Sequence, residues 1–276
     1  MPVRTPSLSC PHPSLSAPGA YNPRMTQPPA PETSPARLCT AVNCSVGRPA
    51  GDPDLDRAGA LGLDRIELWW PWTTPEPPDD RVDDLLAELS RRRLTLVALN
   101  FWGGDTSVGD RGVLHRHALT QRHLDIHARV AEATGADRFN LLVGRGGRRT
   151  TAAQLDRVAA VADSVASRIP GTVLIEPSRS PGPGPADYPV QTPEDADRVI
   201  RAVSGTGLLM DFWHVPELAD AWLRDLAESG TVPVHVQLAD DPGRGSPGSG
   251  VLPLGRWVSA LRAAGYTGDI AGEWVW

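Results

Sequence analysis

Short apolar runs alternate with longer amphipathic stretches along most of the chain. Turn residues bound eight runs that have the length and side-chain character of strands. These runs span residues 38–45, 65–69, 95–100, 138–143, 172–176, 207–211, 232–237 and 269–273. Helical periodicity between them predicts helices at residues 79–92, 116–134, 151–168, 193–203, 216–228 and 253–264. Eight strands that alternate with helices predict a parallel (β/α)8 TIM barrel, with an open doubly wound sheet as the alternative.

Both ends of the predicted barrel are unusual. The last strand ends at residue 273, so the usual eighth helix is expected to be missing, and the segment at 51–61 after the first strand is short. Residues 1–36 are rich in proline, serine and threonine, a composition that cannot build a core. We therefore expect a disordered extension over residues 1–36 and a barrel domain over residues 37–276. A barrel without its last helix would expose an apolar flank, which predicts a homo-oligomer.

The basic residues narrow the possible functions. The sequence has no lysine, so all 27 basic residues are arginines. Schiff-base aldolases, pyridoxal-phosphate enzymes and Walker-type nucleotide binders each need a lysine amine, so this composition excludes them. The net charge of -6 is spread along the chain without a basic stripe, and nucleic acid is therefore not an expected partner.

Cysteine content and hydropathy bear on the compartment. Three cysteines, Cys10, Cys39 and Cys44, cannot form an even disulfide framework, which fits a reducing environment. No apolar run approaches the roughly 20 residues that span a bilayer, and the N-terminus has no hydrophobic signal core. We expect a cytoplasmic protein with no membrane partner.

Four polar residues close the predicted strands five to eight, one on each strand: Glu176, Asp211, Gln237 and Glu273. The reactive groups of a parallel barrel collect at the carboxyl ends of its strands, so these side chains should meet at one rim. A single acidic residue at a strand end is more often a helix cap or a solvated turn residue, but four in register favour a shared site. Three carboxylates and an amide oxygen suit Mg²⁺ or Mn²⁺ rather than structural zinc.

An ordered set of short motifs from residue 38 to the C-terminus resembles the hydroxypyruvate isomerase family of xylose isomerase-like TIM barrels. The motifs are Leu-Leu-Val-Gly at 141–144, Leu-Ile-Glu-Pro at 174–177, Asp-Phe-Trp-His at 211–214, His-Val-Gln-Leu-Ala-Asp at 235–240, Gly-Arg-Gly-Ser-Pro-Gly-Ser-Gly at 243–250 and Gly-Glu-Trp at 272–274. The loop from Asn100 to Gly112 is similar to that family too. Val251 departs from the pattern, because a glutamate commonly follows this glycine-rich loop in the family.

The resemblance implies a metal-dependent isomerase with a small hydroxy-carbonyl acid as substrate. It implies that Glu176, Asp211, Gln237 and Glu273 bind a divalent metal, and that Glu176 and Glu273 act as the acid–base pair. The reaction would interconvert hydroxypyruvate and tartronate semialdehyde through an enediolate. The same motifs leave open a 2-oxo-tetronate isomerase, a ketose epimerase, an inosose dehydratase or a catalytically silent barrel that binds sugar acids.

Four further residues are candidates for substrate binding. His214 could orient the substrate, and Arg244 could clamp its carboxylate in a fork. Glu67 and Asn100, near the ends of the second and third strands, could contact substrate hydroxyls. Each has a plain structural alternative: a capping histidine, a solvated arginine, a rim salt bridge and a turn asparagine, respectively.

Two other sequence patterns could indicate a binding site, but the sequence favours a structural interpretation of each. The glycines at 243–248 match a dinucleotide fingerprint by letter, but Pro247 interrupts the turn and the motif comes last in the chain rather than first. Four histidines at positions 115, 117, 123 and 127 lie in or before one predicted helix, where we expect a solvated face. His235 points the same way as Gln237 one layer deeper, and we expect it to be a hydrogen-bonded core residue.

Overall fold

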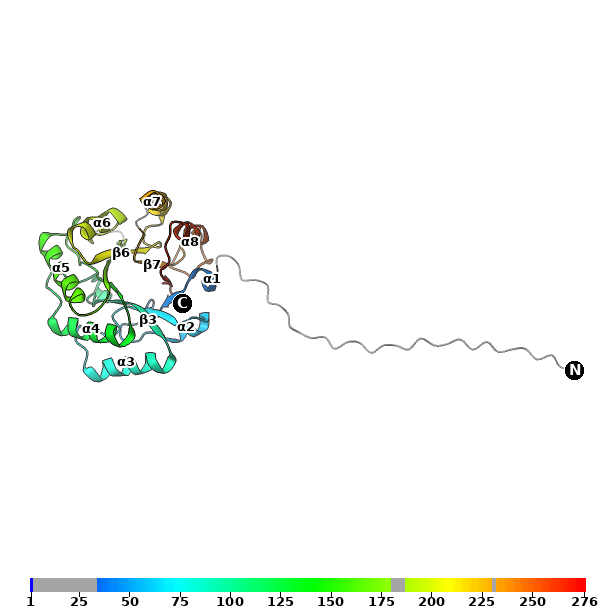
Figure 1. The fold of residues 1–276 in the computed structure, drawn as a ribbon, viewed down its shortest axis with the longest axis horizontal. Coiled ribbons are helices and arrows are strands. Elements are labelled where there is room, and N and C mark those ends of the chain that lie inside the picture. Colours follow the sequence, from blue (N-terminus) through cyan, green and yellow to red (C-terminus); the bar gives the residue numbers. More distant parts are fainter. Residues whose placement is uncertain (2–33, 180–186, 230–231) are drawn as a thin grey trace.

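The computed structural model describes Met1 and residues 34–179, 187–229 and 232–276. Eight parallel strands follow one another in chain order and close into a barrel (Figure 1). They are β1 (Ala41–Asn43), β2 (Arg65–Leu68), β3 (Thr95–Asn100), β4 (Arg138–Asn140), β5 (Thr172–Ile175), β6 (Thr206–Asp211), β7 (His235–Leu238) and β8 (Ile270–Gly272). β1 pairs with β8, so the predicted TIM barrel is confirmed and the open-sheet alternative is wrong.

Helices surround the barrel, as Figure 1 shows. The bounds are α1 (Pro35–Leu38), α2 (Asp56–Leu61), α3 (Asp79–Arg92), α4 (Gln121–Thr134), α5 (Ala152–Ala166), α6 (Pro193–Ala202), α7 (Pro216–Ser229) and α8 (Leu254–Ala263), with a 3-10 turn at Thr106–Val108. α4 starts five residues later than the predicted 116 because the Thr120 side chain accepts a hydrogen bond from the His123 backbone N–H and caps the helix there. The bounds of the other five predicted helices differ from the prediction by at most two residues, whereas α1 and α2 were not predicted.

No helix follows β8 in the described chain, as the spacing predicted. The side chains of Val42 and Ile270 point outward from β1 and β8, yet both are fully buried. Leu38 of α1 and Leu261 of α8 belong to the same buried cluster, and α1 contacts α8. The flank is therefore covered by the chain itself, which removes the physical reason given for assembly, and the homo-oligomer stays a prediction.

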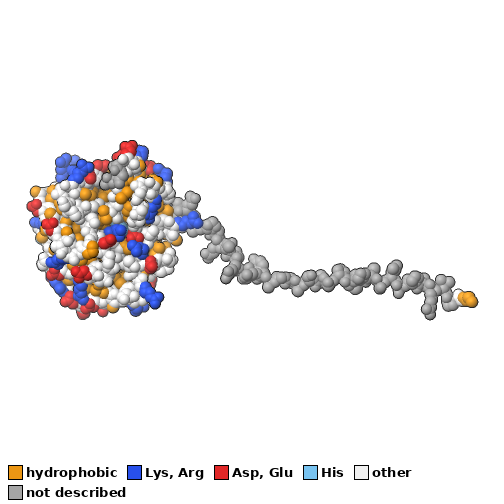
Figure 2. Space-filling view, viewed as in Figure 1, with side chains coloured by type: hydrophobic (Ala, Val, Ile, Leu, Met, Phe, Trp, Pro, Cys, Tyr) orange, Lys and Arg blue, Asp and Glu red, His pale blue; other side chains and the backbone are white. Residues whose placement is uncertain are grey.

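The predicted extension at 1–36 lies outside the described residues, apart from Met1 and residues 34–36. Pro35 and Ala36 belong to α1. Cys39 and Cys44 are buried free thiols, whereas Cys10 falls in the part of the chain that is not described. On the face drawn in Figure 2, acidic and basic side chains are interspersed rather than segregated. Among the described residues, no helix combines the length and apolarity that crossing a bilayer requires.

Candidate active site

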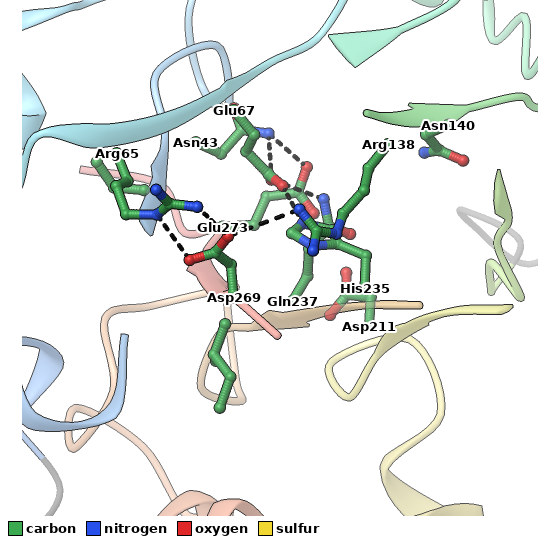
Figure 3. Close-up of polar contacts among 12 residues, drawn as sticks. Asn43, Arg65, Glu67, Arg138, Asn140, Asp211, His235, Gln237, Asp269 and Glu273 are labelled. Atoms are coloured by element: carbon green, nitrogen blue, oxygen red, sulfur yellow. Dashed lines mark hydrogen bonds and ion pairs between the residues drawn. The ribbon is translucent and has the colours of Figure 1, made fainter. Parts of the chain in front are cut away.

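The four strand-end residues reach one end of the barrel interior. Asp211 of β6 lies in register with Gln237 of β7, so their side chains point the same way from neighbouring strands. Glu176 and Glu273 follow directly after β5 and β8. All four side chains are buried, and Figure 3 shows Asp211, Gln237 and Glu273 gathered on the inner side of the strands.

Glu67 of β2 organises the layer beneath them (Figure 3). Its Oε1 accepts hydrogen bonds from Asn43 Nδ2 at 2.8 Å and from Gln237 Nε2 at 2.7 Å. Its Oε2 lies 2.7 Å from His235 Nε2. Asn43 Nδ2 also reaches Glu273 Oε1 at 3.0 Å, so this layer connects to the strand-end carboxylates. His235 is thus the hydrogen-bonded core residue that the sequence predicted.

Only the nitrogen of the Gln237 side-chain amide has a hydrogen-bond partner among the described residues. Its amide nitrogen donates to Glu67, while its Oε1 is buried and has no hydrogen-bond partner. Gln237 Nε2 must point toward Glu67, because only the amide nitrogen can donate to a carboxylate. Gln237 Oε1 therefore points away from Glu67, toward the strand-end carboxylates. A buried carbonyl oxygen without a hydrogen-bond donor lowers the stability of the fold, but it is a suitable ligand for a cation.

Arg244, from the loop after β7, bridges two of the carboxylates. Its Nη2 donates to Asp211 Oδ2 at 2.8 Å and to Glu273 Oε2, and its Nε donates to the Glu273 backbone carbonyl at 2.8 Å. The guanidinium lies over the ring of Trp213, with 4.5 Å to the ring centroid. Arg244 itself has a left-handed backbone, with φ 57. The side chain therefore balances part of the negative charge of the site.

His214 faces Glu176 and Asp211 from the other side. Its Nε2 lies 3.5 Å from Glu176 Oε1 and 3.7 Å from Asp211 Oδ2, so these three residues could hold a metal by proximity alone. The Arg179 backbone N–H, however, donates to His214 Nδ1 at 3.1 Å. Arg244 Nη1, which can only donate, lies 3.3 Å from His214 Nε2, so both ring nitrogens face protein donors and neither is free to bind a metal. The oxygen set that includes Gln237 is therefore the better candidate.

Burial perturbs the titration of all three carboxylates. Desolvation raises the pKa of Glu176 to about 7, and the neighbouring charge of Asp211 adds to the rise. Desolvation also raises the pKa of Asp211 and raises that of Glu273 well above its usual value, although the Arg244 charge opposes both shifts. A cluster with these shifts is short of positive charge, and a divalent cation would supply it.

A cavity of about 360 Å³ opens above the carboxylates. Its floor includes Glu176 and Glu273, and His214, Arg244 and Asn100 also line it. Four tryptophans from the segments after β2 and β3 form an aromatic wall of the cavity: Trp69, Trp70, Trp72 and Trp102. Trp69 Nε1 donates to Glu273 Oε1 at 2.6 Å, so the wall also holds one of the carboxylates in place.

The predicted substrate-binding residues thus lie at different depths. His214, Arg244 and Asn100 line the cavity, whereas Glu67 lies below it with both oxygens engaged by protein groups. This placement favours a role for Glu67 in positioning Asn43 and Gln237. The glycine-rich loop at 243–248 follows β7, and the hairpin that it forms around Asp240 has no helix directly after it, so it does not fit the dinucleotide reading.

The prediction of a solvated histidine face was wrong for the helix itself. His123 and His127 are buried, with His123 packed against Trp70 at 4.3 Å between ring centroids and His127 stacked on Phe101 at 4.0 Å. They lie on the inner face of α4, where aromatic residues after β2 and β3 provide partners that the helical spacing could not reveal. Of the four histidines, His117 is the one with an exposed side chain.

Two site residues escaped the sequence analysis. Asn43 donates to Glu67 and Glu273, and Asn140 Nδ2 donates to Glu176 Oε2 at 2.7 Å. Both close their strands in the structure, but the predicted strands at 38–45 and 138–143 extended beyond them and hid them inside apolar runs. Shorter strand boundaries would have identified both residues as polar strand ends.

Comparison with known proteins identifies the family to which this barrel belongs. The profile of the family described as xylose isomerase-like TIM barrel matches residues 55–275. The chain belongs to this family. A Streptomyces coelicolor relative is 33% identical, over 80% of this chain and 85% of its own length. A Homo sapiens relative is 29% identical, over 79% of this chain and 81% of its own length. Both are provisionally named hydroxypyruvate isomerase.

Solved structures of other proteins share the fold. The structure of an AP endonuclease, family 2, from Brucella melitensis superposes with a TM-score of 0.69 at 22% identity and covers 86% of this chain and 93% of its own. A D-psicose 3-epimerase superposes with a TM-score of 0.64 at 14% identity and covers 86% of this chain and 85% of its own. At these identities the likeness extends to the barrel only. Together with the curated relatives, the family makes this chain an enzyme of the isomerase type.

Proposed function

We propose that the chain is a metal-dependent isomerase that interconverts hydroxypyruvate and tartronate semialdehyde. One observation carries the proposal: two buried glutamates, Glu176 and Glu273, face the same cavity from β5 and β8. The names of the curated relatives supply the substrate.

The reaction requires two carbon–proton exchanges. One group removes a proton from the hydroxyl-bearing C3 of hydroxypyruvate, which gives an enediolate, and a proton is returned at C2 while the hydroxyl proton moves between the two oxygens. Glu176 and Glu273 share these transfers in our proposal. A carboxylate whose pKa is raised toward neutrality can both accept and return a proton near pH 7, and burial brings the pKa of Glu176 to about 7.

The two glutamates have different hydrogen-bond partners, and this suits them to different proton transfers. Glu176 Oε2 is held by Asn140, while Oε1 has only the longer approach of His214 and lines the cavity. Both oxygens of Glu273 accept hydrogen bonds, from Asn43 and Trp69 at Oε1 and from Arg244 at Oε2. Glu176 is therefore the better placed to take the first proton, and Glu273 exchanges a proton once Arg244 has released it.

Glu176, Asp211, Gln237 and Glu273 would hold a divalent cation, Mg²⁺ or Mn²⁺. The unpartnered Oε1 of Gln237 and the raised pKa values of the three carboxylates support this set. When bound, such a cation acidifies the C–H next to a chelated carbonyl and stabilises developing negative charge on oxygen. His214 Nε2 lies near Glu176 Oε1 and Asp211 Oδ2, and Arg244 Nη1 lies 3.3 Å from the same nitrogen, so His214 links the two carboxylates to Arg244.

The direct test is turnover of hydroxypyruvate, followed by ¹H NMR of the hydroxymethyl and aldehyde-hydrate signals. We expect interconversion that stops in excess EDTA and returns when Mg²⁺ or Mn²⁺ is added. Full activity in excess EDTA would contradict the metal site.

The same assay with a 2-oxo-tetronate, a ketose and an inosose separates the related reactions. Faster epimerisation of the ketose, or faster dehydration of the inosose, would assign the chain to that reaction instead. Metal retention without turnover of any of these compounds would identify a silent barrel.

A further inference from the structure

Three arginines line the cavity, and they differ in what holds their charge. Arg48, near the rim, forms an ion pair with Asp52. Arg244 is engaged by Asp211 and Glu273. Of the described residues, only Ser178 hydrogen-bonds to Arg111, with 2.8 Å between Nη1 and Oγ, and no carboxylate lies within ion-pair reach of its guanidinium. Arg111 is thus the cavity-lining cation whose charge no carboxylate balances.

The loop between β3 and α4 is built to hold Arg111 in place. Next to it, the Asp110 carboxylate accepts a hydrogen bond from the Asp105 backbone N–H at 3.0 Å and pairs with Arg116 at 2.7 Å. On its other side, the Gly112 N–H donates to the Gly103 carbonyl at 2.8 Å. Gly112 has φ +82, and a Cβ there would lie 1.9 Å from the Leu142 carbonyl oxygen, so only glycine permits this close approach.

Contacts of the Arg111 head group place it beside the proposed chemistry. Its partner Ser178 is fully buried two residues after Glu176, and Ser178 Oγ lies 3.4 Å from His214 Nε2. His214 Nε2 in turn lies 3.5 Å from Glu176 Oε1. The Arg111 charge is also among those that lower the pKa of Glu176, which agrees with this proximity. A ligand group bound to Arg111 would therefore sit next to the carbon atoms that Glu176 reaches.

We propose that Arg111, rather than Arg244, binds the carboxylate of the substrate and thereby selects short hydroxy-carbonyl acids over neutral sugars. This inference rests on the proposed isomerase function. A guanidinium presents a planar fork of N–H donors that matches a carboxylate, and Ser178 occupies only Nη1. Tryptophans in the cavity wall exclude water, which strengthens such an ion pair.

Charge, rather than size, would then decide which substrates are accepted. A cavity of about 360 Å³ is roomy enough for molecules larger than a three-carbon acid, so its volume does not exclude a hexose. In hydroxypyruvate the carboxylate is bonded directly to the reacting carbonyl carbon, C2. Anchoring that group on Arg111 beside Ser178 presents C2 and C3 to Glu176, whereas a neutral sugar leaves the half-buried guanidinium without a carboxylate partner.

The test compares an unreactive acid with its neutral analogue. Glycerate and glyceramide have the same shape, and their binding to EDTA-treated protein is followed by quenching of the cavity tryptophans. For the wild type we expect glycerate to bind about 10- to 100-fold tighter than glyceramide, the scale of one charge-assisted pair. Arg111→Met should remove this preference, Arg111→Lys should keep part of it, and Arg48→Met, the matched control at the rim, should retain it. With hydroxypyruvate, Arg111→Met should raise KM more than it lowers kcat.

Several results would overturn the inference. One is equal binding of glycerate and glyceramide by the wild type, and another is an undiminished preference in Arg111→Met with a lost preference in Arg244→Met. A melting curve for each variant separates loss of binding from loss of the fold. If the glycerate preference depends on Arg111 but hydroxypyruvate is not turned over, the anion site stands and the proposed reaction fails.

Discussion

At the scale of single residues, Glu176 and Glu273 carry the same group in different surroundings. One oxygen of Glu176 has only His214 nearby, whereas Glu273 is held on both oxygens by Asn43, Trp69 and Arg244. The difference follows from position, since Glu176 lies beside β4 and Glu273 closes the barrel next to β1. Their proton transfer is therefore open to a test in which each is altered separately.

Glu176→Gln and Glu273→Gln each keep the shape and one ligating oxygen but remove the group that accepts a proton. We expect either change to lower turnover by at least about 10²-fold, the scale of general acid–base catalysis. Asp211→Asn is the comparison variant, and it should act through metal affinity and be partly rescued by excess metal. Near-normal kcat in both glutamine variants, with metal content unchanged, would refute the assignment.

His123 is a second residue whose surroundings set its chemistry. Burial lowers its pKa to about 4, while its Nδ1 donates to the Pro75 carbonyl at 2.9 Å and its Nε2 accepts from the Trp102 N–H. Its ordinary pKa is 6.5. Between these two values the unfolded chain binds a proton that the folded chain does not, so acidification favours unfolding.

We therefore expect the free energy of unfolding to fall as the pH drops from about 6.5 to about 4, and His123 should contribute about 1.4 kcal/mol per pH unit. His123→Asn can keep the donor to Pro75 without a titrating ring. Urea unfolding at pH 7 and pH 5 should show a shallower pH dependence for this variant. An unchanged slope would mean that His123 is not held neutral in the fold.

At the scale of elements, the segment from Gly103 to Arg116 shapes one side of the cavity although it contains only one short 3-10 turn. Its form depends on the Asp110 carboxylate and on the contact of Gly112 with the chain after β4. These few contacts, rather than regular hydrogen bonding, define the conformation of the loop. A change at one glycine should therefore disturb the cavity more than a change within a helix.

Gly112→Ala should destabilise the fold by at least about 1–3 kcal/mol, because an alanine there combines a left-handed backbone with a clash against the Leu142 carbonyl. It should also weaken glycerate binding, since Arg111 is the preceding residue. Gly59→Ala in α2 is the control, and it should be neutral or stabilising by about 0.5–1 kcal/mol because nothing lies within 4 Å of its Cβ position. Equal melting temperatures for the two variants would contradict the role given to Gly112.

At the scale of the whole molecule, no helix follows β8 among the described residues. α1, which contacts α8, supplies Leu38 to the same core cluster as Val42 of β1 and Ile270 of β8. The segment before β1 thus helps to cover strands that a helix usually covers.

Leu38→Ala should therefore cost about 2–5 kcal/mol of stability, as for other leucines removed from a packed core. Arg37→Ala in the same turn, with an exposed side chain, should change stability by less than about 0.5 kcal/mol. A chain that begins at Ser34 should melt with the full-length protein, because a tail of that composition buries little surface. A melting temperature for Leu38→Ala equal to that of Arg37→Ala would show that α1 does not close the barrel.

The sequence by itself determined the barrel and the four polar residues that close strands at one end of it. Strand and helix periods are local properties, so eight strands and the helix at Asp79–Arg92 could be predicted from them. The same alternation placed Glu176, Asp211, Gln237 and Glu273 at consecutive strand ends, because parallel strands align their carboxyl ends. The order of the motifs then indicated the family that the comparison identified.

Only the tertiary structure decided how those residues are charged and partnered. The spacing of α4 did not reveal that His123 and His127 are buried, because their partners Trp70 and Phe101 come from loops after other strands. Likewise, the ion pairs of Arg244 join it to residues 29 and 33 positions away, and the contact of Arg111 with Ser178 spans 67 positions. Sequence patterns report which face a side chain is on, whereas its charge balance depends on distant groups that meet when the barrel closes.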